Sequence, residues 1–191
     1  ALEDYEGILK EHDGEDQAGK YDPETGYVNA QKTFGMIELV SNYFPVESIA
    51  DELTTDMESK LRSGVTAVHD MEVTSMNIFK AYLQARKDWQ ESKSVEFPIT
   101  EVHVNPVLME RIIKESDSLV ESGMFSFDEI PHIGIKLIAD GSFGARTSFL
   151  GEKYNDSDEV GLMYDKVGTL NRVVEMARKE GLSKLADHGI G

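Results

Sequence analysis

The chain has 191 residues, of which 36 are acidic and 19 are basic, so its formal net charge at pH 7 is −17. This balance argues against binding to duplex nucleic acid or anionic membranes, and the absence of cysteine excludes disulfides, thiolate metal sites and cysteine nucleophiles. No apolar run reaches the roughly 18 residues of a membrane span, and the N-terminus lacks a signal-peptide layout. We therefore expect a packed, cytoplasmic protein.

Residues 1–45 are acidic and show little periodicity. Two stretches, Asp13–Asp16 and Asp22–Gly26, combine the Asp, Gly and Pro residues that form turns. We predict loops with a hairpin here, and one helical piece around Phe34 to Tyr43. In our domain assignment this segment precedes a partial α/β-barrel catalytic domain at residues 46–191.

From Pro45 onward, apolar residues at helical spacing alternate with short β-branched runs. We expect Gly64 to end the first helix, because a helix C-terminus favours a left-handed residue, and Ser75 to cap the second. The pattern predicts four helices, over 49–61, 75–89, 108–123 and 167–180. It also predicts four strands, a buried one at 65–68 and others at 99–105, 133–139 and 182–187.

Helices that alternate with strands across short turns are typical of a parallel sheet covered by helices. In such folds the functional residues lie at the C-terminal ends of the strands. This rule selects five residues before any chemistry is considered: His69, Asp70, Asn105, Asp140 and His188.

Lys136 is the most informative residue, because it interrupts the apolar strand at 133–139. A period of two places Lys136, Ile138 and Asp140 on one face of that strand. Burial of an isolated ammonium costs several kcal/mol, so the lysine must pair with an acid, lose its proton or be modified. A neutral amine can take up carbon dioxide to form a carbamate, which is an oxygen ligand for metals. The alternative is a buried ion pair, with Asp140 as one candidate partner.

Histidines are the second candidate ligands. His188 ends the last predicted strand before small residues, which suits either a metal ligand or a satisfied histidine at a sheet edge. His69 follows the first strand, His103 lies within the second, and no HxH or HExxH motif is present. A zinc site needs at least three protein ligands, so the chain does not encode a complete one.

A long connection at 141–163 follows the third strand. Loops beyond about 12–15 residues in compact domains are usually functional or disordered. Gly141 and Gly144 allow close approach of a ligand to the backbone, and Arg146 is placed to clamp a substrate anion. The alternative for Arg146 is an ordinary surface ion pair.

Three segments in order form a recognisable series: Gly64–Asp70, Ile135–Thr147 and His188–Gly191. They resemble the YtcJ-like branch of the amidohydrolase superfamily, the amidohydrolase-3 group, which includes N-substituted formamide deformylases and exoenzyme-regulatory proteins. Tyr154 and Gly161 also fit the pattern that follows the family's DGS motif. The series covers most of residues 64–191, and the first sixty residues match only loosely.

The resemblance implies a metal-dependent hydrolase on an α/β barrel, in which metal-activated water attacks a non-peptide C–N bond of a small molecule. It implies that Lys136 is a carboxylated metal bridge on the fourth strand and that His188 is a ligand after the fifth. We assign Asp140, Ser142, Arg146 and His103 as candidate substrate-binding residues. The expected metal is divalent, with zinc as the first choice.

The family's HxH motif, its later histidine and its general-base aspartate are missing. We therefore expect an internal fragment that covers about strands 2–5 of a (β/α)8 TIM barrel and contains no complete catalytic site. Such a fragment is predicted to be inactive, to bind zinc weakly or not at all, and to form homo-oligomers through exposed sheet edges.

Two other functions remain open from the sequence. One is a non-catalytic regulatory module that keeps the barrel scaffold. The other is a complete doubly wound domain that binds an anionic ligand at Gly141–Gly144.

Overall fold

The computed structural model describes residues 21–22, 24–25, 27–28, 32–93, 95–123, 132–163, 167–179, 181 and 185–188. The chain divides into two compact units. One comprises residues 1–39 and 136–191, and the other comprises residues 40–135. The predicted division at residue 45 stays a prediction.

Two long helices form one layer of the 40–135 unit, α3 (Val46–Arg62) and α4 (Met76–Ser92). They pack through a cluster of small side chains, Ala50, Ala81 and Ala85, which allows the helix backbones to approach closely. Ser75 caps α4, because its hydroxyl accepts hydrogen bonds from the backbone N–H groups of residues 77 and 78. Both helices and the cap confirm the sequence prediction.

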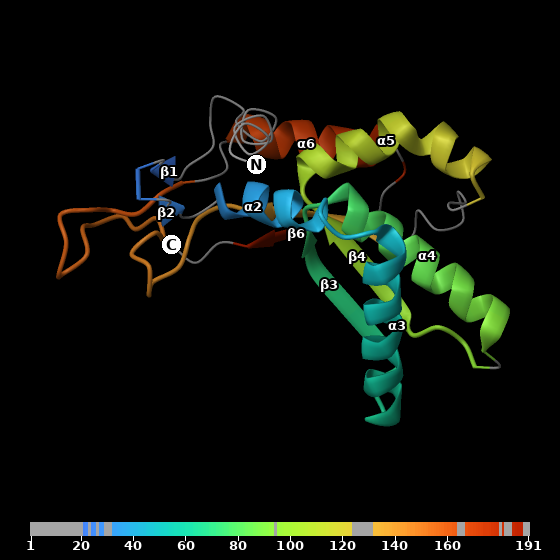
Figure 1. Cartoon of the computed structure of the whole chain (residues 1–191). Helices are drawn as coiled ribbons and strands as arrows, with labels where there is room; N and C mark the ends of the chain where they lie inside the picture. The colour runs from blue at the N-terminus through green and yellow to red at the C-terminus, as the bar shows by residue number, and fades with distance from the viewer. Residues whose placement is uncertain are drawn as a thin grey trace. The chain divides into compact units, whose positions relative to one another are not determined.

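The strands of this unit are joined by parallel pairing. β3 (Ala67–Val73) pairs with β4 (Ile99–Val104), and β4 pairs with the start of β5 (Ile133–Ile138). The helix α5 (Pro106–Glu121) connects β4 to β5 and begins at the cap residue Asn105, whose side chain accepts a hydrogen bond from Leu108 N at 2.8 Å. β3 and β4 run alongside each other in Figure 1. The predicted alternation of helices and parallel strands is confirmed.

The first strand differs from its prediction. We expected a buried strand at 65–68 with His69 and Asp70 beyond its end, but β3 begins at Ala67 and continues to Val73. Alternate residues of β3 are exposed, and Val65 has 40% of its surface exposed. The physical reason is the position of β3 at the end of the order β3-β4-β5-β6, where only one side is paired. His69 and Asp70 therefore lie inside the strand.

The pairing register assigns residues to the two faces of this sheet. His69 pairs with Glu101 and His103 pairs with Gly134, so these four residues share one face. The opposite face carries Asp70 and buried apolar residues of β4 and β5, and it is the face against which α4 packs, since Tyr82 Oη bonds Asp70 there.

The remaining described elements are short or belong to the other unit. A small antiparallel hairpin joins β1 (Tyr21–Asp22) to β2 (Tyr27–Val28), as predicted for the N-terminal segment. The predicted helical piece is α2 (Lys32–Ser41), followed much later in the chain by α6 (Val167–Lys179) and β6 (Leu185–His188). None of the helices within the described ranges combines the length and apolar character needed to cross a bilayer.

Candidate functional site at the ends of β5 and β6

β5 presents Lys136 within an apolar strand. Ile135 and Leu137 have 0% and 2% of their surfaces exposed, whereas Lys136 between them is half-buried. The structure thus places Lys136 on the strand face opposite Ile135 and Leu137, as the period of two predicted, but the lysine is half-buried and not enclosed. The Lys136–Asp140 ion pair considered from the sequence is not formed between these two described residues, because Asp140 bonds elsewhere.

His188 is the last residue of β6, which follows β5 in the sheet order. The backbone therefore puts this histidine at the end of the strand that neighbours the lysine strand, as the sequence predicted. The side chain of His188 lies outside the described part of the structure, so its role as a ligand stays a prediction.

Asp140 follows β5 and is buried, with 4% of its surface exposed. Its Oδ2 accepts hydrogen bonds from Ser148 Oγ at 3.2 Å and from Phe149 N at 2.9 Å. An antiparallel bridge also joins Asp140 to Met163, at the far end of the connection. The carboxylate predicted to bind substrate therefore holds the middle of the 141–163 loop, while the backbone of Asp140 bridges to the far end.

Two glycines are required by the close packing of this loop. A Cβ on Gly141 would lie 2.0 Å from Thr147 Oγ1, and one on Gly161 would lie 1.9 Å from Ser148 O. Gly161 also has φ of +89°, in the region that side chains disfavour. The glycines thus allow the loop to pack against itself.

The same loop uses the amides that an anion would need. Gly141 N donates to Thr147 O at 3.0 Å, and Ser142 N donates to Thr147 Oγ1 at 3.0 Å. The side chain of Ser142 is exposed, while its carbonyl accepts from Thr147 N at 3.0 Å. Two backbone amides of the predicted anion site at Gly141–Gly144 are therefore already engaged in hydrogen bonds within the loop.

Arg146 forms a bidentate ion pair within the loop. Its Nε lies 3.0 Å from Asp156 Oδ1 and its Nη2 lies 2.5 Å from Asp156 Oδ2. The hydrogen bond to Arg146 holds the pKa of Asp156 below its usual value, and the same bond raises the pKa of Arg146. Both groups are exposed, which matches the surface-pair alternative weighed for Arg146.

His103 belongs to the 40–135 unit and is buried in β4, with 5% of its surface exposed. Its ring lies against Gly134, where a Cβ would come within 2.5 Å of the His103 Cδ2 atom. The His69 ring is nearly parallel to it, with ring centroids 6.4 Å apart, and His69 Nδ1 lies 3.3 Å from Glu101 Oε2. This group of three polar residues on one sheet face was not predicted from the sequence, because the register that assembles it was unknown.

A second unpredicted contact fixes Asp70. Its Oδ2 accepts a hydrogen bond from Tyr82 Oη on α4 at 2.5 Å. Burial, followed by this bond, raises the pKa of Tyr82 above its ordinary value. Period-two alternation across residues 67–73 was the sequence signal that could have placed Asp70 beneath the helix.

The described side chains do not complete a metal centre. Within the described ranges, His, Asp and Glu residues nowhere gather in groups of three or more that could hold a metal ion. Asp140 is engaged by its own loop, and His103 packs against Gly134. No step of a reaction is therefore assigned to a metal held by these residues alone.

Comparison with known proteins shows that the chain is similar to solved structures in its fold. No protein family matches the chain, and no curated protein matches it. Among solved structures, uncharacterized metal-dependent hydrolases from Pyrococcus furiosus and Pyrococcus horikoshii OT3 align at TM-scores of 0.63 and 0.63, with 23% and 24% sequence identity. The alignments cover 98% and 97% of this chain but 37% and 35% of those chains, so the chain spans little more than a third of their length.

Proposed function

We propose that the chain is part of a longer metal-dependent hydrolase of the amidohydrolase type, which cleaves a non-peptide C–N bond of a small molecule. In this proposal the chain supplies about strands 2–5 of a (β/α)8 barrel. The whole enzyme supplies the remaining metal ligands and the general base.

The observation that carries the proposal is an alignment of nearly the whole chain with part of two metal-dependent hydrolases. The positions of two residues support it further. Lys136 interrupts an apolar strand, and His188 ends the strand next to it in the sheet. Ligands at the C-terminal ends of neighbouring parallel strands are the usual arrangement for α/β-barrel enzymes.

In this proposal Lys136 acts through a covalent modification of its amine rather than through its positive charge. Lys136 is half-buried on β5. The neutral form of its amine would add carbon dioxide and release a proton, which gives an anionic carbamate. A carbamate offers two oxygen ligands that would help to hold the metal, zinc in our proposal, and the bound metal would supply activated water in the complete enzyme.

The test compares two proteins, the 191-residue chain and a longer protein that contains it. We expect the longer protein to hold zinc in stoichiometric amounts and to hydrolyse members of a panel of N-substituted amides. The chain alone is expected to show neither property, because a zinc site needs at least three protein ligands. Zinc content by mass spectrometry and amide hydrolysis by product release are the two measurements.

Lys136→Ala in the longer protein is expected to remove most of the metal and to lower the activity at least about a thousandfold. Added propionate should restore part of both, since a small carboxylate can occupy the space of the carbamate. Lys153→Ala is the matched control, because Lys153 is an exposed lysine paired with Asp158 at 3.0 Å. A folded longer protein with neither metal nor hydrolysis would overturn the proposal in favour of the regulatory module.

The proposal also predicts self-association of the chain alone. β3 is at the end of the sheet order, and Met71 on it has 39% of its surface exposed. A strand with one unpaired edge and exposed apolar side chains favours edge-to-edge pairing. Light scattering should therefore report a dimer or larger species, and a monomer at high concentration would contradict this expectation.

A further inference from the structure

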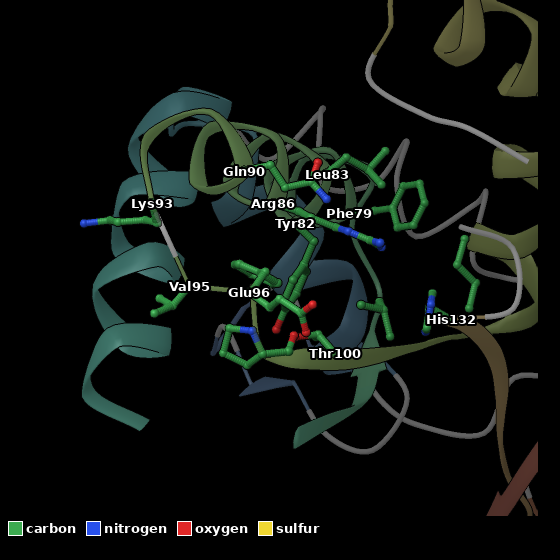
Figure 2. A pocket seen from close by; sticks show the side chains of 14 residues that line it. Phe79, Tyr82, Leu83, Arg86, Gln90, Lys93, Val95, Glu96, Thr100 and His132 are labelled. Carbon is green, nitrogen blue, oxygen red and sulfur yellow. The ribbon is translucent and has the colours of Figure 1, made fainter. Parts of the chain in front are cut away.

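The 40–135 unit contains a pocket of about 450 Å³ beside α4, which we name the α4 pocket. Its walls come from one face of α4, from the segment between α4 and β4, and from the first residues of β4 and β5. This volume lies within the range of about 300–1,000 Å³ typical of small-molecule sites. Figure 2 shows the side chains that line it.

The pocket has apolar walls with fixed geometry. Phe79, Val102 and Ile133 have 1%, 7% and 5% of their surfaces exposed, so core packing holds them in place. Tyr82 is held by its hydrogen bond to Asp70. A hydrocarbon group of a ligand would therefore meet preformed aromatic and aliphatic surfaces, which lowers the entropy lost on binding.

The single tryptophan of the chain supports a further wall. Trp89 Nε1 donates to Val95 O at 2.8 Å, and the Trp89 ring packs edge-on against Phe97 with centroids 5.4 Å apart. Val95 and Phe97 both line the pocket. The tryptophan thus contacts the pocket wall directly, and its fluorescence can report what enters.

The charged lining residues are not equivalent. Lys93 Nζ binds Glu58 on α3 at 2.6 Å, and in Figure 2 the Lys93 side chain points away from the pocket. Arg86 is half-buried, and in the same view its side chain extends from α4 among the lining residues, towards Phe79. Glu96, in the segment before β4, is the acidic lining residue. Arg86 is thus the cation best placed to meet a ligand.

We propose that the α4 pocket binds a small monocarboxylate with an aromatic or branched hydrocarbon part, and that Arg86 binds the carboxylate. A guanidinium has five N–H donors in a planar fork, so it can bind a carboxylate in addition to a partner within the protein. Glu96 disfavours a second negative charge on the ligand. The net charge of −17 disfavours non-specific anion binding, so a specific site is needed to bind a carboxylate.

The test uses the full 191-residue chain and three probes of nearly equal size: phenylacetate, phenylacetamide and phenethylamine. They carry a negative charge, no charge and a positive charge on the same aromatic body. Binding is followed by the fluorescence of Trp89. We expect saturable binding with a Kd for phenylacetate at least about tenfold below that for phenylacetamide, and weaker binding of phenethylamine.

Arg86→Gln should remove the preference for phenylacetate, and Arg86→Lys should retain part of it, because an ammonium keeps the charge without the fork. Lys87→Gln is the matched control: it makes the same charge change at the next, exposed position of α4 and should leave binding unchanged. Thermal unfolding by circular dichroism checks that each variant folds.

Glu96→Gln gives an independent test that does not depend on the folding of Arg86 variants. Glu96 is exposed, and removal of its charge should tighten phenylacetate binding about twofold. Equal binding of all three probes, preference for phenethylamine, or equal effects of Arg86→Gln and Lys87→Gln would overturn the proposal. These measurements need neither metal nor hydrolysis, so they are independent of the proposed function.

Discussion

The 141–163 loop and the α4 pocket both carry charged side chains, but they use them differently. In the loop, Arg146 is bound by Asp156 and Lys153 by Asp158, while the Asp140 carboxylate holds two groups of the loop itself. In the pocket, mostly apolar side chains surround about 450 Å³ of open volume, and Arg86 and Glu96 are among the lining residues. The loop has the recognisable motif, and the pocket has the space for a ligand.

This difference shows that a motif can be conspicuous for structural reasons. Gly141 and Gly161 are needed because a Cβ at either position would overlap side-chain or backbone atoms of the loop. Tyr154 contributes in the same way, since its hydroxyl donates to Ser148 O at 2.8 Å. In this chain the motif residues stabilise the fold of the loop, and any contact with substrate is a second role.

The largest expected effect comes from Gly161→Ala. The added Cβ would lie 1.9 Å from Ser148 O, and φ is +89°. We expect the loop to lose about 3 kcal/mol of local stability. Hydrogen exchange of Leu150 N and Leu162 N, which donate to Val160 O and Thr147 O, should speed up at least about tenfold.

Gly144→Ala is the control for this change, because no atom lies within 4 Å of the added Cβ. It should leave exchange in the loop nearly unchanged. If both variants exchange alike, the loop is not held as described, and the contrast with the α4 pocket fails.

The second effect concerns the sheet of the 40–135 unit. Gly134→Ala would bring a Cβ within 2.5 Å of His103 Cδ2, so the buried ring must move. We expect a loss of about 2 kcal/mol in the free energy of unfolding, measured in urea.

His103→Ala removes the ring that causes this clash. In that background Gly134→Ala should cost at least about 1 kcal/mol less, which a double-mutant cycle measures. Additive costs would mean that the ring does not pack on Gly134 in solution.

Most helices and strands could be predicted from the sequence because their signals are local. Apolar residues at helical spacing, the Ser75 cap and the left-handed Gly64 fixed the limits of α3 and α4 within a few residues. The prediction of a buried strand at 65–68 was wrong, because a buried strand and an edge strand differ in the elements that lie beside them. A short run such as Val65–Val68 does not contain that information.

The candidate site was only partly predictable for a related reason. The ends of β5 and β6 followed from the alternation of elements, which placed Lys136 and His188 on neighbouring strands. The partners of Asp140 and Arg146 are eight to ten positions away inside one loop. Loop contacts of this kind depend on turn geometry that no periodicity encodes.

The third prediction concerns Tyr82, which lines the pocket and binds Asp70. Tyr82→Phe should cost about 1.5 kcal/mol at neutral pH, because a buried hydrogen bond to a carboxylate is lost. The folded state raises the pKa of Tyr82 above its unfolded value of about 10. This contribution is therefore fully present below pH 10 and decreases as the pH rises beyond it.

The pH dependence separates this effect from simple loss of packing. Above pH 10 the original protein should lose up to about 1.4 kcal/mol per pH unit relative to Tyr82→Phe, so the two stability curves converge. Urea unfolding at a series of pH values measures the difference. Parallel curves would show that Tyr82 titrates normally and that the pocket wall is not fixed by Asp70.

The smallest effect is expected at the exposed Arg146–Asp156 pair. Arg146→Gln should raise the pKa of Asp156 back towards its ordinary value, because the hydrogen bond that lowers it is removed. A carboxylate titration by NMR measures this change, and the difference should shrink at high salt. The unfolding midpoint should not change measurably, since exposed pairs contribute little.

Lys153→Gln provides the comparison within the same loop, because it removes a charge from the Asp158 pair and should leave the titration of Asp156 in place. An Asp156 pKa that is the same with and without Arg146 would mean that the pair does not form in solution. Arg146 would then be available to clamp a substrate anion, which is one of the two interpretations that its sequence position allows.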